Sequence, residues 1–246
     1  MLSAAWHNPT GGVRYHLRAA FHRPAWEPFR SALATWLARW QPERSTLAIV
    51  GPSAGHCLPL EPLQQFERLI IFEIDPLARW LLKRRLARAL PGRSITWIAD
   101  DMWIDPIRHG RELPVRLIGA DSAVLFSNIL GQVPYLLEPG EYPDWLKAWR
   151  ERVIPWLERM PWASFHDRVS GAVPPFEALP THHRQLSDAE VSALYENAPV
   201  HDLLELNDHR SPDLLPPGYR YEYLHWPITQ HMHHLIECAF GGPHTT

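Results

Sequence analysis

Hydrophobic positions along the chain follow two patterns, short apolar runs of strand length and longer stretches with helical character. The short runs predict buried strands over residues 45–50, 68–75, 94–101, 121–128 and 162–168. The longer stretches predict helices over residues 24–40, 58–68, 76–90, 142–160 and 186–198. Strands that alternate with helices in this way predict a parallel α/β sheet with helices on both faces.

Three of the predicted helices carry more specific signals. In the first, apolar residues spaced three and four apart form one stripe, which predicts either a core face or the surface of a homodimer: Trp26, Phe29, Leu33, Trp36, Leu37 and Trp40. A bend is expected at Pro155 in the fourth helix. Ser187 and Glu190 have the spacing of a capping box at the start of the last helix.

The C-terminal part of the chain contains two further apolar stretches, residues 219–228 and 233–240. The connection between them, residues 229–232, is too short for a parallel crossover, which needs a dozen or more residues. The two stretches therefore predict an antiparallel hairpin at one side of the sheet.

Small or acidic residues follow each of the first four predicted strands. They are Gly51 and Gly55, Glu73 and Asp75, Asp100 and Asp101, and Ser127 and Asn128. Parallel α/β sheets bind ligands in the crevice at the carboxyl ends of their strands. The ordered series predicts a binding site at that edge.

The glycine loop after the first strand does not fit the common nucleotide fingerprints. A dinucleotide site would need glycine at the positions of Ser53 and His56, and no GK[ST] follows for a P-loop. The pattern resembles instead the first motif of class I S-adenosylmethionine-dependent methyltransferases. Gly51, Ser53 and Gly55 match its three glycine positions, although Ile49 replaces the acid often found two residues before the first glycine.

The resemblance covers residues 44–135. It implies that Glu73 in "FEIDP" binds the ribose hydroxyls, and that Asp101 in "ADDM", rather than Asp100, binds the adenine amino group. It also implies that Ser127 and Asn128 in "LFSNILGQ" lie beside the transferable methyl group of bound S-adenosylmethionine.

A fold is implied as well: a Rossmann-like, mostly parallel seven-stranded sheet with helices on both faces and a C-terminal antiparallel hairpin. In that fold residues 1–43 are expected to form a helical arm or cover, and residues 44–246 the cofactor-binding domain.

Candidate catalytic residues are Asn128 after the fourth strand, His166 on the fifth and Tyr15 in the N-terminal arm. Gln132 also follows the fourth strand, and Asp167 could form a base with His166, although neighbours on a strand point to opposite faces. A base is needed only when the methyl acceptor carries a proton that must leave. The acceptor is expected above the fourth and fifth strands, between Asn128, His166 and Tyr15. Gly11 and Gly12 are compatible with a hinged lid or with a plain structural arm.

The histidines of "HMHH" raise the question of a metal site. His231 and His233 would share one face of a strand. A site needs three or four ligands, and no acidic or cysteine partner is evident nearby in the sequence. No metal is therefore predicted.

Charge and composition narrow the substrate. The net charge of −3 lacks the basic excess of nucleic-acid binders, and the fourth motif reads SNIL rather than the [DNS]-P-P-[YF] of base methylation. Two distant cysteines suit a cytoplasmic protein, and no run is long enough for a membrane span. The chain is expected to methylate nitrogen or oxygen of a small molecule. A protein side-chain methyltransferase and an inactive, methyltransferase-like binding protein are the alternatives.

Overall fold

A computed structural model describes residues 12–179, 181–182, 184–196, 206–218 and 220–243. The helices are α2 (Gly12–His22), α3 (Glu27–Arg39), α4 (Pro76–Ala89), α5 (Ile104–Arg108), α6 (Val133–Leu136), α7 (Tyr142–Arg152), α8 (Ile154–Leu157) and α9 (Asp188–Ala193). The strands are β1 (Thr46–Val50), β2 (Arg68–Phe72), β3 (Ser94–Ile98), β4 (Ser122–Ser127), β5 (Trp162–Gly171), β6 (Thr181–His182), β7 (Asn207–Asp208), β8 (Arg220–Thr229) and β9 (Met232–Gly241).

One mixed sheet organises the molecule, with the strand order β3-β2-β1-β4-β5-β9-β8-β6, and β7 pairs with β5 beside it. The strands β1 to β5 run parallel, whereas β9 is antiparallel to both β5 and β8. The predicted α/β fold with a C-terminal hairpin is confirmed. The two-residue strands β6 and β7 extend the predicted set of seven.

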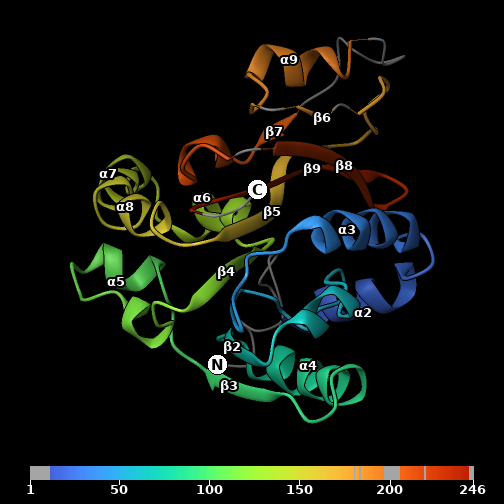
Figure 1. Cartoon of the computed structure of the whole chain (residues 1–246). Coiled ribbons are helices and arrows are strands. Elements are labelled where there is room, and N and C mark those ends of the chain that lie inside the picture. Colours follow the sequence, from blue (N-terminus) through green and yellow to red (C-terminus); the bar gives the residue numbers. More distant parts are fainter. Residues whose placement is uncertain (1–11, 180, 183, 197–205, 219, 244–246) are drawn as a thin grey trace.

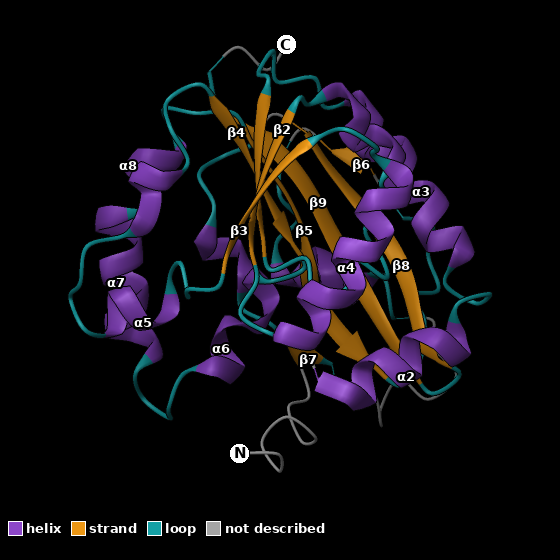
Figure 2. Cartoon of the chain, turned by 90° about the horizontal axis from the view of Figure 1, so that it is seen from below, coloured by secondary structure: helices purple, strands orange, loops and turns teal. Residues whose placement is uncertain are grey.

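Helices cover both faces of the sheet (Figures 1 and 2). The group α2, α3 and α4 lies on one side, and α5, α7 and α8 lie on the other. The central strands β1 and β4 are apolar on both faces because each face meets a helical layer. Along β1, Ala48 and Val50 belong to one core cluster while Leu47 and Ile49 belong to the other.

The three specific helix signals are confirmed, whereas the helix predicted over residues 58–68 is only a short 3-10 helix, Glu61–Gln65. The stripe of α3 is buried throughout and joins the core cluster of Leu47 and Ile49. The predicted bend separates α7 from α8, with Val153 at the junction. Ser187 and Glu190 form the complete capping box of α9.

The C-terminal hairpin is formed by β8 and β9, as the short connection predicted. Residue 219, at the start of the predicted first strand, lies outside the described residues. No helix in the described ranges combines the length and the apolar character that crossing a bilayer requires.

We expect the tryptophan stripe of α3 to be essential for stability. Trp36 has 0% exposure and packs near Phe240 of β9, with ring centroids 6.1 Å apart. Trp36→Ala should lower the free energy of unfolding by about 3–5 kcal/mol, because it removes transfer energy and leaves a cavity. The matched control is Trp80→Ala on α4, where the ring is 47% exposed; it should cost no more than about 0.5 kcal/mol. Denaturant unfolding measures both, and equal costs would contradict the core assignment.

Candidate functional site

The loop after β1 takes a conformation that requires glycine at its start. Gly51 has φ of +66°, and an added β carbon would lie 2.8 Å from Cβ of Ile129. The amide of Gly51 donates to the carbonyl of Phe72 at 3.0 Å, which extends the pairing with β2 by one residue. Ser53 follows, also with positive φ, at +51°. A molecule bound above the end of β1 can therefore approach the backbone of this loop closely.

Gly55, the third residue of the motif, lies against α4. Its φ is +65°, and an added β carbon would lie 2.8 Å from Leu82 and 3.1 Å from the Arg85 guanidinium. Arg85 donates to the carbonyl of Ala54 at 2.8 Å and also to that of Gly55. Gly55 thus permits close packing of the loop on the helix, and it does not line the cavity described below.

Glu73 connects the glycine loop to the end of β2. Its carboxylate accepts the amide of Ser53 at 2.7 Å and the amide of Asp75 at 2.9 Å, and the residue is 7% exposed. Burial raises the pKa of Glu73, although the two amides oppose that shift. Asp75 itself caps α4, since its side chain accepts from the amides of Leu77 and Ala78.

The two acids after β3 have different environments. Asp101 accepts three backbone amides at the start of α5, from Trp103, Ile104 and Asp105, at 2.9, 3.0 and 2.8 Å. Asp100 is exposed and forms no side-chain hydrogen bond within the described part of the chain. The carboxylate of Asp101 therefore caps α5, whereas the carboxylate of Asp100 is available to accept hydrogen bonds from a ligand.

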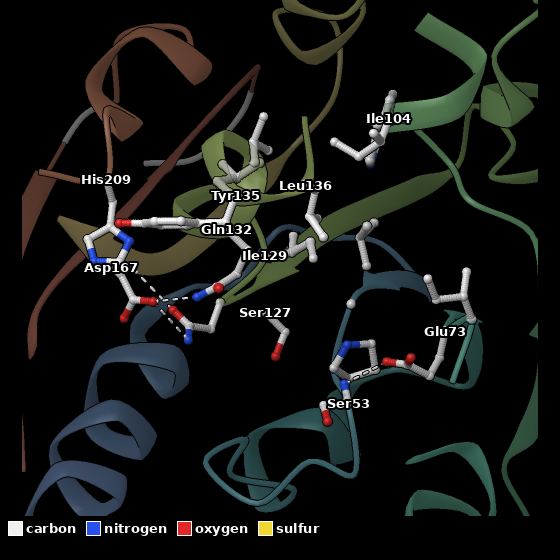
Figure 3. A pocket seen from close by; sticks show the side chains of 18 of the residues that line it. Ser53, Glu73, Ile104, Ser127, Ile129, Gln132, Tyr135, Leu136, Asp167 and His209 are labelled. Atoms are coloured by element: carbon white, nitrogen blue, oxygen red, sulfur yellow. Dashed lines mark hydrogen bonds between the residues drawn. The ribbon is translucent and has the colours of Figure 1, made fainter. Parts of the chain in front are cut away.

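Gly51, Ser53, Glu73 and the acids after β3 line one cavity of about 750 Å³ at the carboxyl ends of the parallel strands. Of the predicted site residues, the lining includes Tyr15, Gly51, Ser53, Glu73, Asp100, Asp101, Ser127 and Asn128. The buried hydroxyl of Ser127 has no hydrogen-bond partner among the described residues. Figure 3 shows Ser53 and Glu73 at one end of the cavity, and Asp167, Tyr135 and His209 at the other.

The segment after β4 holds the carboxylate of Asp167. Asn128 has φ of +55°; its side-chain oxygen accepts the Asp167 amide at 3.1 Å, and its Nδ2 lies 3.5 Å from Oδ2 of Asp167. Gln132 donates to the same Oδ2 at 2.6 Å. Gly131 permits this approach, because an added β carbon would lie 2.7 Å from the Asp167 carbonyl oxygen.

His166 is not brought into the cavity. Adjacent residues of a strand point to opposite faces, so the residue after it, Asp167, faces the cavity instead. His166 is fully buried, with Nδ1 2.8 Å from the Ser164 hydroxyl and Nε2 3.4 Å from the Glu237 carboxylate. The predicted position of His166 beside the acceptor therefore needs correction by one residue.

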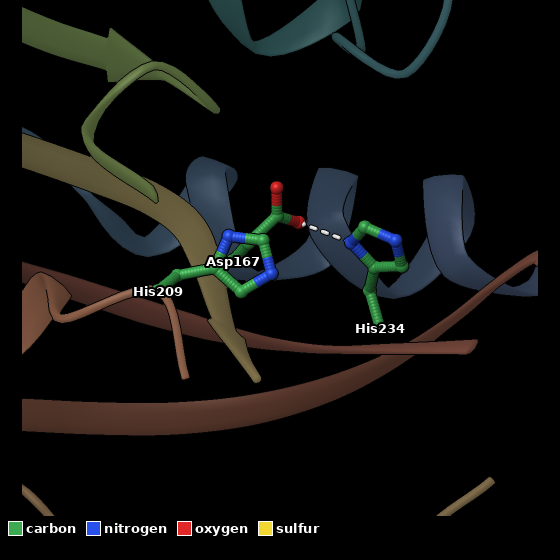
Figure 4. A group of neighbouring side chains, drawn as sticks. All are labelled: Asp167, His209 and His234. Atoms are coloured by element: carbon green, nitrogen blue, oxygen red, sulfur yellow. Dashed lines mark hydrogen bonds and ion pairs between the residues drawn. The ribbon is translucent and has the colours of Figure 1, made fainter. Parts of the chain in front are cut away.

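Two histidines flank Asp167 in the structure (Figure 4). His234 of β9 has Nδ1 2.7 Å from Oδ1 of the carboxylate. His209, directly after β7, has Nδ1 2.8 Å from the Gly131 carbonyl and Nε2 3.0 Å from the Ser170 hydroxyl. Burial lowers the pKa of His209. Burial alone would raise the pKa of Asp167, but the facing His234 lowers it, so the carboxylate is ionised at neutral pH.

The sequence did not indicate His209 as a site residue. It follows a two-residue strand, which is too short to show an alternating pattern. The histidines proposed from "HMHH" separate: His233 pairs with His225 at 2.9 Å, and His231 bonds Gln230 in the turn. The sequence showed no acidic partner near these histidines, and no metal was predicted for that reason. The structure provides such a partner for His234, because the pairing of β5 with β9 brings Asp167 next to it.

The N-terminal helix α2 closes one side of the cavity with Tyr15 and Arg18. His16 connects α2 to two neighbouring segments. Its Nδ1 lies 3.1 Å from Nε2 of His56, directly after the glycine loop, and its Nε2 lies 3.7 Å from the carboxylate of Asp75 at the start of α4. Burial raises the pKa of Tyr15, so its phenol stays protonated at neutral pH. Gly11, half of the predicted hinge, lies outside the described residues.

No protein-family model and no curated protein matches the sequence. In fold, the chain is similar to many class I S-adenosylmethionine-dependent methyltransferases. Three such structures illustrate the range. For the plantazolicin methyltransferase BpumL in complex with SAH, the TM-score is 0.39 at 12% identity, over 67% of this chain and 56% of that protein.

The N-methyltransferase NodS from Bradyrhizobium japonicum, in complex with S-adenosylhomocysteine, gives a TM-score of 0.38 at 13% identity, over 80% of this chain and 78% of that protein. For a putative RNA methyltransferase from Pyrococcus horikoshii, the TM-score is 0.36 at 13% identity, over 80% of this chain and 74% of that protein. The likeness is confined to the fold.

We expect Asn128 to affect the stability of the fold through both its side chain and its backbone conformation. Asn128→Ala and Asn128→Gly remove the same hydrogen bonds to Asp167, but only glycine relieves the left-handed backbone. Both variants should be less stable than the parent protein, with Asn128→Ala the less stable of the two by about 1 kcal/mol. Denaturant unfolding measures the difference. If the alanine variant is as stable as the glycine variant, the positive φ carries no cost.

Proposed function

We propose that the chain binds S-adenosylmethionine and transfers its methyl group to nitrogen or oxygen of a small molecule. The observation that carries this proposal is the buried carboxylate of Glu73. It lies at the carboxyl end of β2, accepts the Ser53 amide of the glycine loop, and faces the cavity. The strand order reverses direction at β1 and β4, and ligands of open α/β sheets bind at such a switch point.

The residues around Glu73 fit the cofactor. Two of its acceptor sites hold backbone amides, and an ionised carboxylate has about four, so capacity remains for both ribose hydroxyls. The open backbone from Gly51 to Ser53 allows the methionine part to approach closely, and the unpaired Ser127 hydroxyl lies on the path toward β4. We assign the adenine amino group to Asp100 rather than Asp101, because Asp101 already caps α5.

The other end of the cavity fits a small acceptor. The whole cavity has a volume of about 750 Å³, within the range of small-molecule sites of about 300–1,000 Å³, and α2 covers one side of it with Tyr15 and Arg18. Bound S-adenosylmethionine supplies an electrophilic methyl group on a good leaving group. Glu73 and the backbone from Gly51 to Ser53 would hold the cofactor, and a base would be needed only where the acceptor atom carries a proton that must leave. The chain itself provides orientation and exclusion of water.

Transfer can be tested before the acceptor is known. The protein and S-adenosylmethionine labelled in its methyl group are incubated together with the small-molecule fraction of a cell extract. A parallel reaction contains the protein fraction of the extract instead. Label in the small-molecule fraction supports the proposal. Label in the protein fraction would favour a protein side-chain methyltransferase, and binding without any transfer would favour an inactive relative.

Glu73→Ala should weaken binding of S-adenosylhomocysteine at least about tenfold, because it removes charge-assisted hydrogen bonds worth about 1.5–3 kcal/mol each before compensation by water. The matched control is Glu67→Ala, which removes the same charge at the opposite end of β2, where the side chain is exposed. Calorimetry measures both affinities. An unchanged dissociation constant in a folded Glu73→Ala protein would reject the ribose role.

Affinity for S-adenosylhomocysteine should also depend on pH. The ribose hydroxyls donate to the ionised form of Glu73, whose pKa burial raises above the ordinary 4.5. Below that raised pKa the carboxyl is protonated, so affinity should fall by up to about tenfold per pH unit and recover as the pH rises. The neighbouring Asp75 is already ionised there, since hydrogen bonding to His16 lowers its pKa.

Calorimetry between pH 4.5 and 8 provides the measurement, with Glu73→Gln as the variant that cannot titrate. Its affinity should be lower and flat with pH. A flat profile in the parent protein would mean that Glu73 does not meet the hydroxyl groups.

A further inference from the structure

The end of the cavity opposite Glu73 contains a convergent set of possible metal ligands. One ligand atom each from Asp167, His209 and His234 lies within 4.8 Å of the others. The three side chains come from three neighbouring segments of the sheet, because β5 pairs with both β7 and β9 (Figure 4). All three residues line the cavity.

The hydrogen bonds of His209 fix which nitrogen can coordinate. The carbonyl of Gly131 can only accept, so Nδ1 of His209 must carry the proton in that 2.8 Å contact. Nε2 is then the nitrogen with the free lone pair, and the Ser170 hydroxyl at 3.0 Å donates to it. A backbone carbonyl on the second ring nitrogen is the usual outer-shell arrangement of a metal-bound histidine.

Asp167 is a buried carboxylate without a cationic partner other than histidine. It is fully buried, and across the described ranges no lysine or arginine forms an ion pair with it. The adjacent Arg168 points away, to Asp188 and Asp208. Gln132 fixes Oδ2 at 2.6 Å, so Oδ1 is held facing Nδ1 of His234.

We propose that Asp167, His209 and His234 bind one divalent first-row transition metal ion, through Oδ1, Nε2 and Nδ1 respectively. The metal replaces the proton between Asp167 and His234 and the hydroxyl contact of Ser170. Two imidazoles with one carboxylate suit Zn²⁺, Fe²⁺, Co²⁺ or Mn²⁺, whereas Mg²⁺ and Ca²⁺ prefer oxygen ligands alone. Three protein ligands leave coordination positions open toward the cavity, where an oxygen or nitrogen of a bound molecule can reach the ion.

The proposal is tested with Co²⁺ as a spectroscopic probe on chelator-treated protein. One equivalent should give a visible absorption band, which Zn²⁺ displaces and Mg²⁺ does not. His209→Gln and His234→Gln should each weaken Co²⁺ binding about a hundredfold or more, since even outer-shell changes cost about 10–100-fold. The control is His231→Gln, an exposed histidine in the turn before β9, which should bind like the parent.

Circular dichroism and denaturant unfolding establish that each variant is folded. If His209→Gln does not fold, His234→Gln carries the test alone, because His234 is partly exposed. No stoichiometric band, a band lost in His231→Gln, or equal binding by the parent and a folded His234→Gln protein would each overturn the proposal. Binding of S-adenosylhomocysteine to the same preparations is measured separately, so failure of the cofactor assignment and failure of the metal site are distinguishable.

Discussion

The central strands β1 and β4 are buried on both faces, and this constraint determines where charge can lie. Helical layers cover both sides, so a charged side chain along either strand would lose its hydration without gaining a partner. Along β1 and β4, polar side chains therefore lie only at the strand ends. The acids that follow β2 and β3 lie at turns and helix starts, which provide free amides. Glu73, Asp75 and Asp101 each accept at least one such amide.

Two buried carboxylates lie at opposite ends of the cavity, Glu73 directly after β2 and Asp167 within β5, and their negative charges are compensated in different ways. Glu73 accepts neutral backbone amides, which stabilise the ionised form only in part, and burial still raises its pKa. Asp167 faces two imidazoles and the Gln132 amide, and its pKa is lowered. The first suits hydroxyl donors of a neutral ribose. The second places a carboxylate beside two imidazoles, a set of side chains that suits a metal ion in place of the proton between Asp167 and His234.

The sequence predicted the sheet and the Glu73 end because both depend on local patterns. Apolar runs, the α3 stripe and the acids after β2 and β3 are all visible within a few residues. The Asp167 end depends on pairing across long separations: β5 meets β9 in one antiparallel register, and β7 contributes only two residues. A shift of one residue on β5 exchanges His166 for Asp167 at the cavity, and single-sequence patterns do not fix that choice. A motif match also does not show what a residue contacts. Gly55 matches the glycine motif in the sequence, but in the structure it packs against α4.

The two ends of the cavity are joined by the short segment that follows β4. Ile129 fills the space that a side chain at position 51 would need, so it packs directly on the glycine loop. Two residues later, Gly131 lies against the backbone of Asp167, and its carbonyl orients His209. Asn128 begins the segment in a left-handed conformation and bonds the backbone of β5. A shift of this segment would move both walls together, so the distance between the Glu73 end and the Asp167 end is set by rigid local packing rather than by two independent loops.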